Sequence, residues 1–440
     1  MDGEVPILDD LNIAVVGLGY VGLPTALAMH QAGYSVSGID ISKNVIDTLR
    51  EGKSPLIDNT ANEVIPINSE RWKVTSNFRD GLDNVDVVLI TVPTPTNPDN
   101  SPDLSYIISA SESILENLHK EKKVILVLES TVYPGVTREI LGKTCQSYGF
   151  EINKNIFLAY CPERVNPGDT SKGVTSVAQI VGCDNPKIGD FLVQMFSTTT
   201  DAGATYVGKM EVAEASKMIE NVQRDVDIAL VNELAIVLPK LGIDVQDVLK
   251  AASTKWNFHN HTPGIGVGGH CIPVDPYYYI SISEKIGMRS KISTAAREIN
   301  SKMPSIAALD IKRMMRNISN PQVLILGYSY KPELGDTRET PVRELAYNLI
   351  QNGIKIKVWD PVVLKENVPN EFNAIDNPYE FDNVDMILIA TGHKEIINLD
   401  WNKMKNLCKS RIIFDGRRVL DKTIMENNGW TYTGIGVPLV

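Results

Sequence analysis

The fold is decided by residues 11–40, which read LNIAVVGLGYVGLPTALAMHQAGYSVSGID. The β-branched apolar run 11–16 predicts a buried strand, residues 22–33 predict a helix, and residues 35–40 predict a second strand. Strand, helix and strand in this order form a βαβ unit, which is the building block of a parallel sheet.

The turn between the first strand and the helix has the pattern GxGxxG. Its first glycine permits a tight turn, its second lets the backbone approach a pyrophosphate, and its third lets the helix pack closely on the strand. An aspartate ends the second strand, where a carboxylate accepts hydrogen bonds from ribose hydroxyls and repels a 2′-phosphate, so the pattern predicts NAD rather than NADP. The alternative is a turn with a purely structural role. The candidate cofactor contacts here are Gly17, Gly19, Tyr20, Val21, Gly22 and Asp40.

Two later buried strands are predicted at 85–92 and 124–129, and each is followed by a loop with Pro, Ser or Thr. Thr94 and Thr131 lie in these loops, at the carboxyl edge where open α/β sheets bind ligands. Each loop by itself is also ordinary turn chemistry.

The remaining chain predicts a second pattern and then a return to the first. Residues 210–241 have apolar side chains at helical spacing and predict one long helix of about 30 residues. Further strands are predicted at 322–326, 355–359, 385–390 and 411–414. We therefore predict an α/β protein with two Rossmann-like doubly wound domains, at 1–206 and 316–440, joined by a helical middle domain at 207–315.

The composition excludes several classes of protein. The 440 residues include 43 Lys and Arg against 54 Asp and Glu, a net charge of -11, which argues against a nucleic-acid partner. No apolar run reaches the roughly 18 residues of a membrane span, and the acidic start does not resemble a signal peptide, so we expect a cytoplasmic protein. The 5 cysteines are scattered without CxxC spacing, so neither a disulfide framework nor a metal site is expected.

One cysteine lies in an unusual glycine-rich segment, GVGGHCIPVD at 266–275. Dense glycine brings the backbone close to another group and exposes the next side chain. Cys271 is followed four residues later by Asp275, and a thiolate beside an NAD site is suited to attack a carbonyl and form a thioester. His270 either tunes this thiol or anchors the loop. The other four cysteines are interpreted as small buried apolar residues.

Two further groups of polar residues are candidates. Lys217 and Asn221 lie one turn apart on the long helix, and Arg224 extends the same face, although a solvated polar stripe has this pattern too. In the C-terminal third, Lys331 and Arg338 follow a strand in GYSYKP and GDTRETP, and two arginines follow another in DGRR at 415–418. Together these cations favour a phosphate-bearing ligand over a second NAD, the alternative for each being plain surface charge.

These segments together resemble the UDP-sugar 6-dehydrogenase family over about residues 13–420. The motifs that carry the resemblance are GLGYVGLP, TVPTPTN, ESTVYPG, CPERVNPG, EASKMIENVQRDV, GVGGHCIPVDP, GYSYKPELGDTRETP and FDGRRVLD. The resemblance implies a four-electron oxidation of the sugar C6 alcohol by two NAD, through a covalent bond to the cysteine. It also implies a homodimer or higher homo-oligomer with the long helix in its core. The catalytic residues it implies are Cys271, Lys217, Asn221, Asp275, Glu163 and Thr131.

The resemblance further implies which residues hold the UDP-sugar. They are Arg164, Val165, Lys217, Asn221, Arg224, Tyr330, Lys331, Arg338 and Arg418, and the partner of Arg338 is either the UDP-sugar or NAD. The loop GGHCIPVDPYYY and the segment KWNF at 255–258 are similar to the N-acetylhexosamine branch. The expected sugar is thus GlcNAc or GalNAc first, ManNAc second and glucose third. A single-step dehydrogenase and a non-catalytic nucleotide-sugar binding protein are the rival interpretations.

Overall fold

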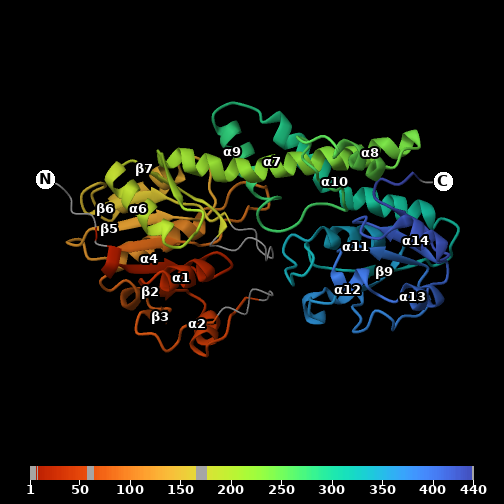
Figure 1. Ribbon diagram of the computed structural model, residues 1–440, viewed down its shortest axis with the longest axis horizontal. Helices are drawn as coiled ribbons and strands as arrows, with labels where there is room; N and C mark the ends of the chain where they lie inside the picture. Colours follow the sequence, from red (N-terminus) through yellow and green to blue (C-terminus); the bar gives the residue numbers. More distant parts are fainter. Residues whose placement is uncertain (1–5, 7, 57–63, 165–175, 439–440) are drawn as a thin grey trace. The chain divides into compact units, whose positions relative to one another are not determined.

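The computed structural model describes residues 6, 8–56, 64–164 and 176–438. The chain divides into two compact units, one of residues 1–220 with 277–288 and one of residues 221–276 with 289–440. Each unit contains one sheet with helices on it (Figure 1). The residues of the predicted middle segment 207–315 are thus shared between the two units, and the three-part division remains a prediction.

The sheet of the first unit has eight strands in the order β3-β2-β1-β4-β5-β6-β7-β8, and its neighbours are parallel except for β6 and β7. The order 3-2-1-4-5-6 of its first six strands is that of dinucleotide-binding folds. Strands β4 and β5 are buried throughout, as expected of parallel strands covered on both faces. The strands are β1 (Asn12–Val16), β2 (Ser35–Ile39), β3 (Trp72–Thr75), β4 (Val87–Ile90), β5 (Val124–Leu128), β6 (Ile156–Tyr160), β7 (Gln179–Cys183) and β8 (Ala204–Gly208).

Helices cover this sheet and bury two apolar clusters against it. The first helix begins at the third glycine of the GxGxxG turn, as the sequence predicts. The elements are η1 (Leu8–Asp10), α1 (Gly22–Gln31), α2 (Lys43–Arg50), α3 (Phe78–Gly81), α4 (Ser105–Asn117), the π-helical turn η2 (Thr137–Leu141), α5 (Gly142–Ser147) and α6 (Pro186–Ser197).

The sheet of the second unit has five parallel strands in the order β10-β9-β11-β12-β13. This is the 2-1-3-4-5 order of the other common doubly wound fold. The two sheets therefore share the doubly wound arrangement but differ in strand order. The strands are β9 (Gln322–Leu326), β10 (Lys355–Trp359), β11 (Met386–Ile389), β12 (Ile412–Asp415) and β13 (Thr431–Gly434). The helices are α8 (Val245–Ala252), α10 (Lys291–Met314), α11 (Pro341–Gln351), α12 (Lys394–Ile397), α13 (Trp401–Leu407) and α14 (Lys422–Asn427), with short 3-10 turns η5 (Lys365–Asn367) and η6 (Asn370–Phe372).

The long helix is α7 (Met210–Val237), with 28 residues. It ends before the predicted position 241 because Pro239 lacks an N–H and favours the 3-10 turn η4 (Leu238–Leu241) that follows. Gly242, in the left-handed region at φ 75°, closes this turn. A further helix, α9 (Asp275–Lys285), follows the cysteine loop.

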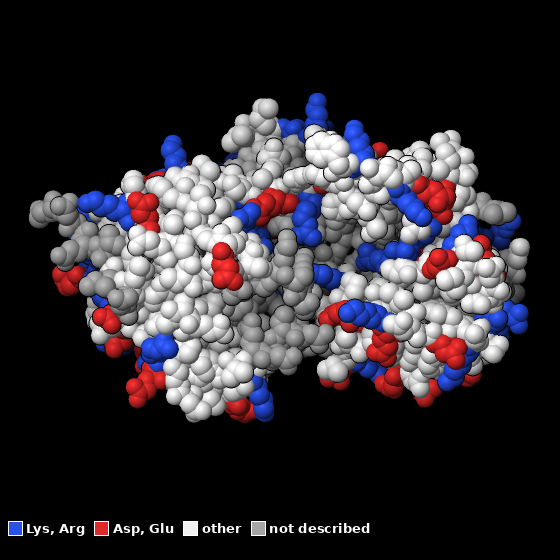
Figure 2. All heavy atoms as spheres, viewed as in Figure 1, with Lys and Arg blue, Asp and Glu red and all other residues white. Residues whose placement is uncertain are grey.

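The surface carries Asp and Glu interspersed with Lys and Arg on the face shown in Figure 2. Among the residues that the structure describes, none of the helices combines the length and the apolar character that a membrane crossing requires.

Candidate functional site

The glycine turn of the first unit has the geometry that a pyrophosphate requires. Gly17 is in the left-handed region at φ 95° and donates its N–H to Ile39 O at 2.8 Å. A Cβ on Gly22 would lie 1.8 Å from Gly17 O, so only glycine fits there. A Cβ on Gly19 would meet no atom within 4 Å, so the backbone is open on that side. The residues present therefore fit a dinucleotide phosphate above the start of α1.

Asp40 holds this turn in place. Its Oδ2 accepts the N–H of Leu18 at 2.8 Å, and its Oδ1 accepts the N–H of Ser42 at 2.8 Å. The residue remains partly exposed. Because each carboxylate oxygen has a second lone pair, Asp40 can still accept a hydroxyl hydrogen bond.

The two threonine loops lie at the carboxyl ends of β4 and β5, as predicted. Ser130 Oγ donates to Val92 O at 2.6 Å, which ties one loop to the other. Tyr278 OH donates to Thr94 O at 3.0 Å, so α9 supports the first loop. Thr131, like Tyr20 and Val21 of the glycine turn, is partly exposed.

Cys271 differs from the other four cysteines in its exposure, because it is partly exposed and they are buried. Burial raises the pKa of the Cys145 thiol to about 12 and that of Cys183 to about 11. It also raises the pKa of Cys161 and Cys408. A thiolate is the reactive form, so these four thiols are suited to packing rather than chemistry.

The glycines before Cys271 allow the cysteine loop to pack against the loop that follows β9, which contains Tyr330 and Arg338. A Cβ on Gly268 would lie 2.6 Å from Tyr330 Cβ, and one on Gly269 would lie 2.7 Å from the Tyr330 ring. Gly269 N–H donates to Arg338 O at 3.3 Å. The group that the dense glycines bring close is therefore the loop of Tyr330 and Arg338.

A buried amide and a buried carboxylate lie beside the cysteine loop. Asn221 Nδ2 donates to Asp275 Oδ2 at 2.5 Å. Asp275 begins α9, and its N–H donates to Cys271 O at 2.8 Å. Lys217, one turn before Asn221 on α7, is 9 % exposed, whereas Arg224 is exposed. The predicted polar face is therefore buried at Lys217 and Asn221 but not at Arg224.

The second sheet has an aspartate at the position that corresponds to Asp40 of the first sheet, but the side chain of this aspartate is buried. Asp360 follows β10, has a fully buried side chain, and accepts the N–H groups of Tyr328 at 2.6 Å and Ser329 at 3.0 Å. Burial alone would raise the pKa of Asp360, but the hydrogen bond and charge of His393, with the two N–H groups, lower it to about 2. An enclosed carboxylate is not available to a ribose, which agrees with a ligand other than a second NAD.

Two cations flank this region. Lys331 is partly exposed, and Arg338 is exposed while its Nη2 pairs with Asp336 Oδ2 at 2.6 Å. Both follow β9, as the sequence predicts.

The family follows from matches along the chain. Residues 11–200 match the NAD binding domain of the UDP-glucose/GDP-mannose dehydrogenase family, residues 211–302 its central domain and residues 324–422 its UDP binding domain. The chain belongs to this family. It is an NAD-dependent UDP-sugar dehydrogenase, with NAD as its cofactor.

The dehydrogenase is similar to relatives that differ in the sugar they act on. It is 36 % identical to a UDP-N-acetyl-D-glucosamine 6-dehydrogenase of Pseudomonas aeruginosa over 94 % of this chain and 98 % of that one. It is 33 % identical to a UDP-N-acetyl-D-mannosamine dehydrogenase of Methanococcus aeolicus over 97 % of this chain and 95 % of that one. A solved structure of the UDP-D-ManNAc dehydrogenase of Pyrococcus horikoshii has a TM-score of 0.88 and 30 % identity, covering 98 % of this chain and 100 % of that one.

The loop after β6 of the dehydrogenase contains Glu163 and Arg164. Arg164 Nη2 pairs with Glu220 Oε1 at 2.6 Å, and the N–H of Arg164 donates to Glu163 Oε1 at 2.6 Å. The guanidinium thus joins the loop to α7. Val165, predicted as a substrate contact, lies outside the described residues.

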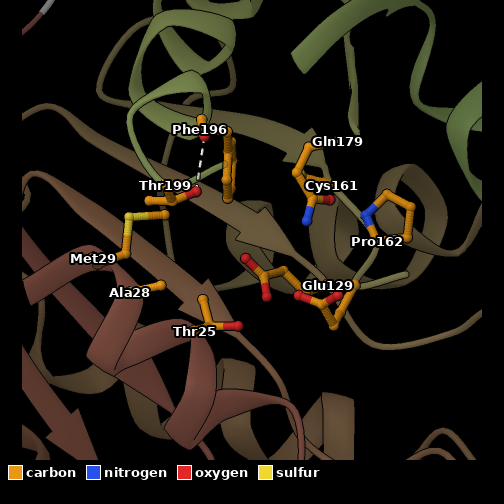
Figure 3. Close-up of a pocket in the computed structure, with 10 residues that line it drawn as sticks. Thr25, Ala28, Met29, Glu129, Cys161, Pro162, Gln179, Phe196 and Thr199 are labelled. Carbon is orange, nitrogen blue, oxygen red and sulfur yellow. Dashed lines mark hydrogen bonds between the residues drawn. The ribbon is translucent and has the colours of Figure 1, made fainter. Parts of the chain in front are cut away.

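A small cavity of about 10 Å³ in the first unit has Glu163 among its lining residues, and Figure 3 shows other residues that line it. Thr25, Glu129 and Gln179 line it, and Glu129 Oε1 and Gln179 Oε1 are buried with no hydrogen-bond partner among the described residues. Burial first, and then the charge of Glu163, raise the pKa of Glu129 well above its ordinary value. Burial and the nearby charge of Glu163 therefore both favour the protonated form of the Glu129 carboxyl.

Arg418 has a different environment from the one expected of a substrate contact. Its guanidinium pairs with Asp244 at 2.9 Å and also donates to Gln246 Oε1 and Ile435 O, and 2 % of its side chain is exposed. These partners hold α8 to the C-terminal strand region, which favours a structural role. We therefore leave Arg418 out of the proposed site.

Sequence reasoning missed the buried polar residues behind the site. Asp225 lies one turn beyond Asn221, so its place on the buried face could have been read from the spacing. Arg297 and Asn300, which contact Asp225, come from α10, and no motif marked them. His393 was missed for the same reason.

Proposed function

We propose that the dehydrogenase oxidises the C6 alcohol of a UDP-N-acetylhexosamine to a carboxylate in two steps, through a covalent bond to Cys271. The observation that carries this proposal is the setting of that thiol. It is the partly exposed cysteine among four buried ones, on a loop whose backbone packs on Tyr330, next to the hydrogen-bonded pair Asn221 and Asp275. A single-step dehydrogenase has no use for such a thiol.

The chemistry balances over two oxidations. NAD bound at the glycine turn supplies the hydride acceptor in each of them. The alcohol first loses a hydride and a proton and becomes an aldehyde. The Cys271 sulfur then adds to the aldehyde carbon, and loss of a second hydride leaves a thioester. Water displaces the sulfur, so that one alcohol, two NAD⁺ and one water give one carboxylate, two NADH and three protons.

The neighbouring residues have matching roles in this proposal. The Lys217 ammonium stabilises the developing negative charge on the C6 oxygen, which a buried cation does more strongly than an exposed one. Asn221 orients Asp275, which handles protons near the thiol. Glu163 acts as the base that activates the hydrolytic water, and Thr131 positions that water.

We assign binding of the UDP part of the substrate to residues in and around the loop that follows β9. Lys331 and Arg338 provide positive charge for the diphosphate, and Tyr330 lines the same loop. Arg338 has its carbonyl against Gly269, so we assign it to the UDP-sugar rather than to NAD. Arg164 and Arg224 complete the proposed contacts.

For the sugar we propose GlcNAc or GalNAc, then ManNAc, and glucose last. The GGHC loop and the KWNF segment support an N-acetylhexosamine. The Pseudomonas aeruginosa relative, named for UDP-N-acetyl-D-glucosamine, supports the first choice, and the Methanococcus aeolicus relative, named for the mannosamine, supports the second.

A homodimer is part of the proposal. Val212, Ile219, Leu230 and Val237 of α7 are each about half exposed. Their spacings of 7, 11 and 7 residues are close to whole numbers of helical turns, so they form one apolar stripe. A second copy of the chain packed against this stripe would remove it from water. Light scattering tests this with Leu230→Glu, which should give monomers.

The decisive experiment counts NADH formed per sugar consumed, with UDP-GlcNAc, UDP-GalNAc, UDP-ManNAc and UDP-glucose in separate reactions. We expect a ratio of two with the preferred N-acetylhexosamine. We expect Cys271→Ser to stop before the second NADH. A ratio of one in the wild type, or full activity in Cys271→Ser, refutes the covalent route.

A further inference from the structure

A buried polar cluster joins α7 and α10 in the second unit, and the chemistry proposed above does not use it. It consists of Asp225 and Asn232 from α7 and Arg297 and Asn300 from α10. Arg297 Nε donates to Asp225 Oδ2 at 2.9 Å, and Arg297 Nη2 pairs with Asp225 Oδ1 at 2.9 Å. This is the paired geometry of a guanidinium on a carboxylate, and the two side chains are 5 % and 1 % exposed.

The two asparagines extend the pair into a continuous chain of hydrogen bonds. Asn300 Nδ2 donates to Asp225 Oδ1 at 2.7 Å and to Asp225 O at 3.0 Å. Asn232 Nδ2 donates to Asn300 Oδ1 at 2.8 Å. Well-packed apolar residues often stabilise two helices at least as well as a buried ion pair does. The cluster is therefore better explained by what it contacts outside the two helices.

Those outside contacts are with the two ends of the cysteine loop. Arg297 Nη1 donates to Pro273 O at 3.1 Å, two residues after Cys271. At the other end, Gly264 N–H donates to Asn232 Oδ1 at 3.0 Å. Between these ends Ile265 is buried in the core and Gly268 and Gly269 pack against Tyr330, and the two end contacts add to this packing in holding the segment that carries Cys271.

We propose that Arg297 is a positioning residue for the Cys271 thiol, with Asp225, Asn300 and Asn232 as the frame that fixes both ends of the loop. The proposal rests on the proposed function in that it takes Cys271 as the nucleophile. The arrangement needs arginine because one rigid planar group serves the carboxylate with two nitrogens and Pro273 O with the third. A lysine ammonium would keep the charge but not this geometry.

The test is Arg297→Lys, measured by the rate at which iodoacetamide labels Cys271 and by steady-state kinetics. Labelling is selective because the other four cysteines are buried. We expect the labelling rate to change several-fold and kcat to fall on the order of tenfold to a hundredfold, as for a misplaced reacting group, while the KM for NAD changes less than twofold. Asn232→Ala, a milder change at the other end of the loop, should shift both rates in the same direction and carries the test if Arg297→Lys does not fold.

The matched control is Asp244→Asn, which removes the charge from another buried arginine pair of this unit, the one with Arg418. It should lower the melting temperature and leave Cys271 labelling and kcat unchanged. The inference is overturned if Arg297→Lys and Asn232→Ala behave like this control. The labelling readout does not depend on the reaction, so full activity of Cys271→Ser would refute the proposed function while the labelling result still decided the positioning role.

Discussion

Replacing Gly19 and Gly22 by alanine, one at a time, separates the two tasks of the glycine turn. A Cβ at position 22 would lie 1.8 Å from Gly17 O and 2.4 Å from Thr91 Oγ1. The backbone must move to relieve this overlap, and overpacking of that kind costs about 1–3 kcal/mol or more. Gly22→Ala should therefore lower the melting temperature of the enzyme without NAD and also weaken NAD binding.

Gly19→Ala should weaken NAD binding without lowering the melting temperature. The added Cβ meets no atom within 4 Å, and Gly19 is not in the left-handed region. Gly-to-Ala changes at such positions stabilise by about 0.4–1 kcal/mol through the unfolded chain. We predict, however, that the methyl group would occupy the side from which the pyrophosphate approaches. Loss of one hydrogen bond to a charged phosphate costs about 1.5–3 kcal/mol, or roughly a 10- to 150-fold rise in Kd.

Calorimetric titration with NAD and a thermal melt of each variant check both results. An unchanged Kd in Gly19→Ala would mean that the phosphates do not lie over this turn. An unchanged melting temperature in Gly22→Ala would mean that the contact with Gly17 relaxes at no cost, and the packing argument for the third glycine would fail.

Three further predictions concern carboxyl groups. Glu129→Gln should have the same melting temperature as the wild type below pH 4.5 and a higher one as the pH rises. The raised pKa of Glu129 gives the wild-type native state a stability that is lost when the carboxyl loses its proton. A difference in melting temperature that stays constant across pH would contradict this. Asp360→Asn should remove a stability that is present above pH 3.8 and is lost as the pH falls towards 2. A shift of roughly two pKa units corresponds to about 2 kcal/mol. The melting temperatures of the two proteins should therefore converge as the pH is lowered from 5 to 2.5. Asp40→Asn should reduce the preference for NAD over NADP by about tenfold or more in kcat/KM, since the charge that repels a 2′-phosphate is gone; an unchanged preference would place discrimination elsewhere.

Local sequence predicted most of the elements. The first βαβ unit, β4 and β5 of the first sheet and β9 to β12 of the second follow from runs of apolar residues closed by Gly, Pro or Asp, because these signals act over a few residues, whereas β3, β8 and β13 were not predicted. The end of the long helix was placed four residues too late, at 241 rather than Val237, because the helical period of the apolar residues continues through Pro239 although the α-helix does not. The same local reasoning marked the glycine turn, Asp40 and the loop of Cys271.

The sequence by itself predicted two largely parallel sheets, an NAD site at a glycine turn and one distinctive cysteine, because each of these is encoded in a short run of consecutive residues. Only the tertiary structure decided what those residues touch. In the structure Tyr330 packs against Gly269, and Arg418 pairs with Asp244. His393 contacts the buried Asp360, and Arg297 connects Pro273 to Asp225. Such contacts join residues tens to hundreds of positions apart. Their partners are chosen by the packing of whole helices and sheets, which no short pattern records.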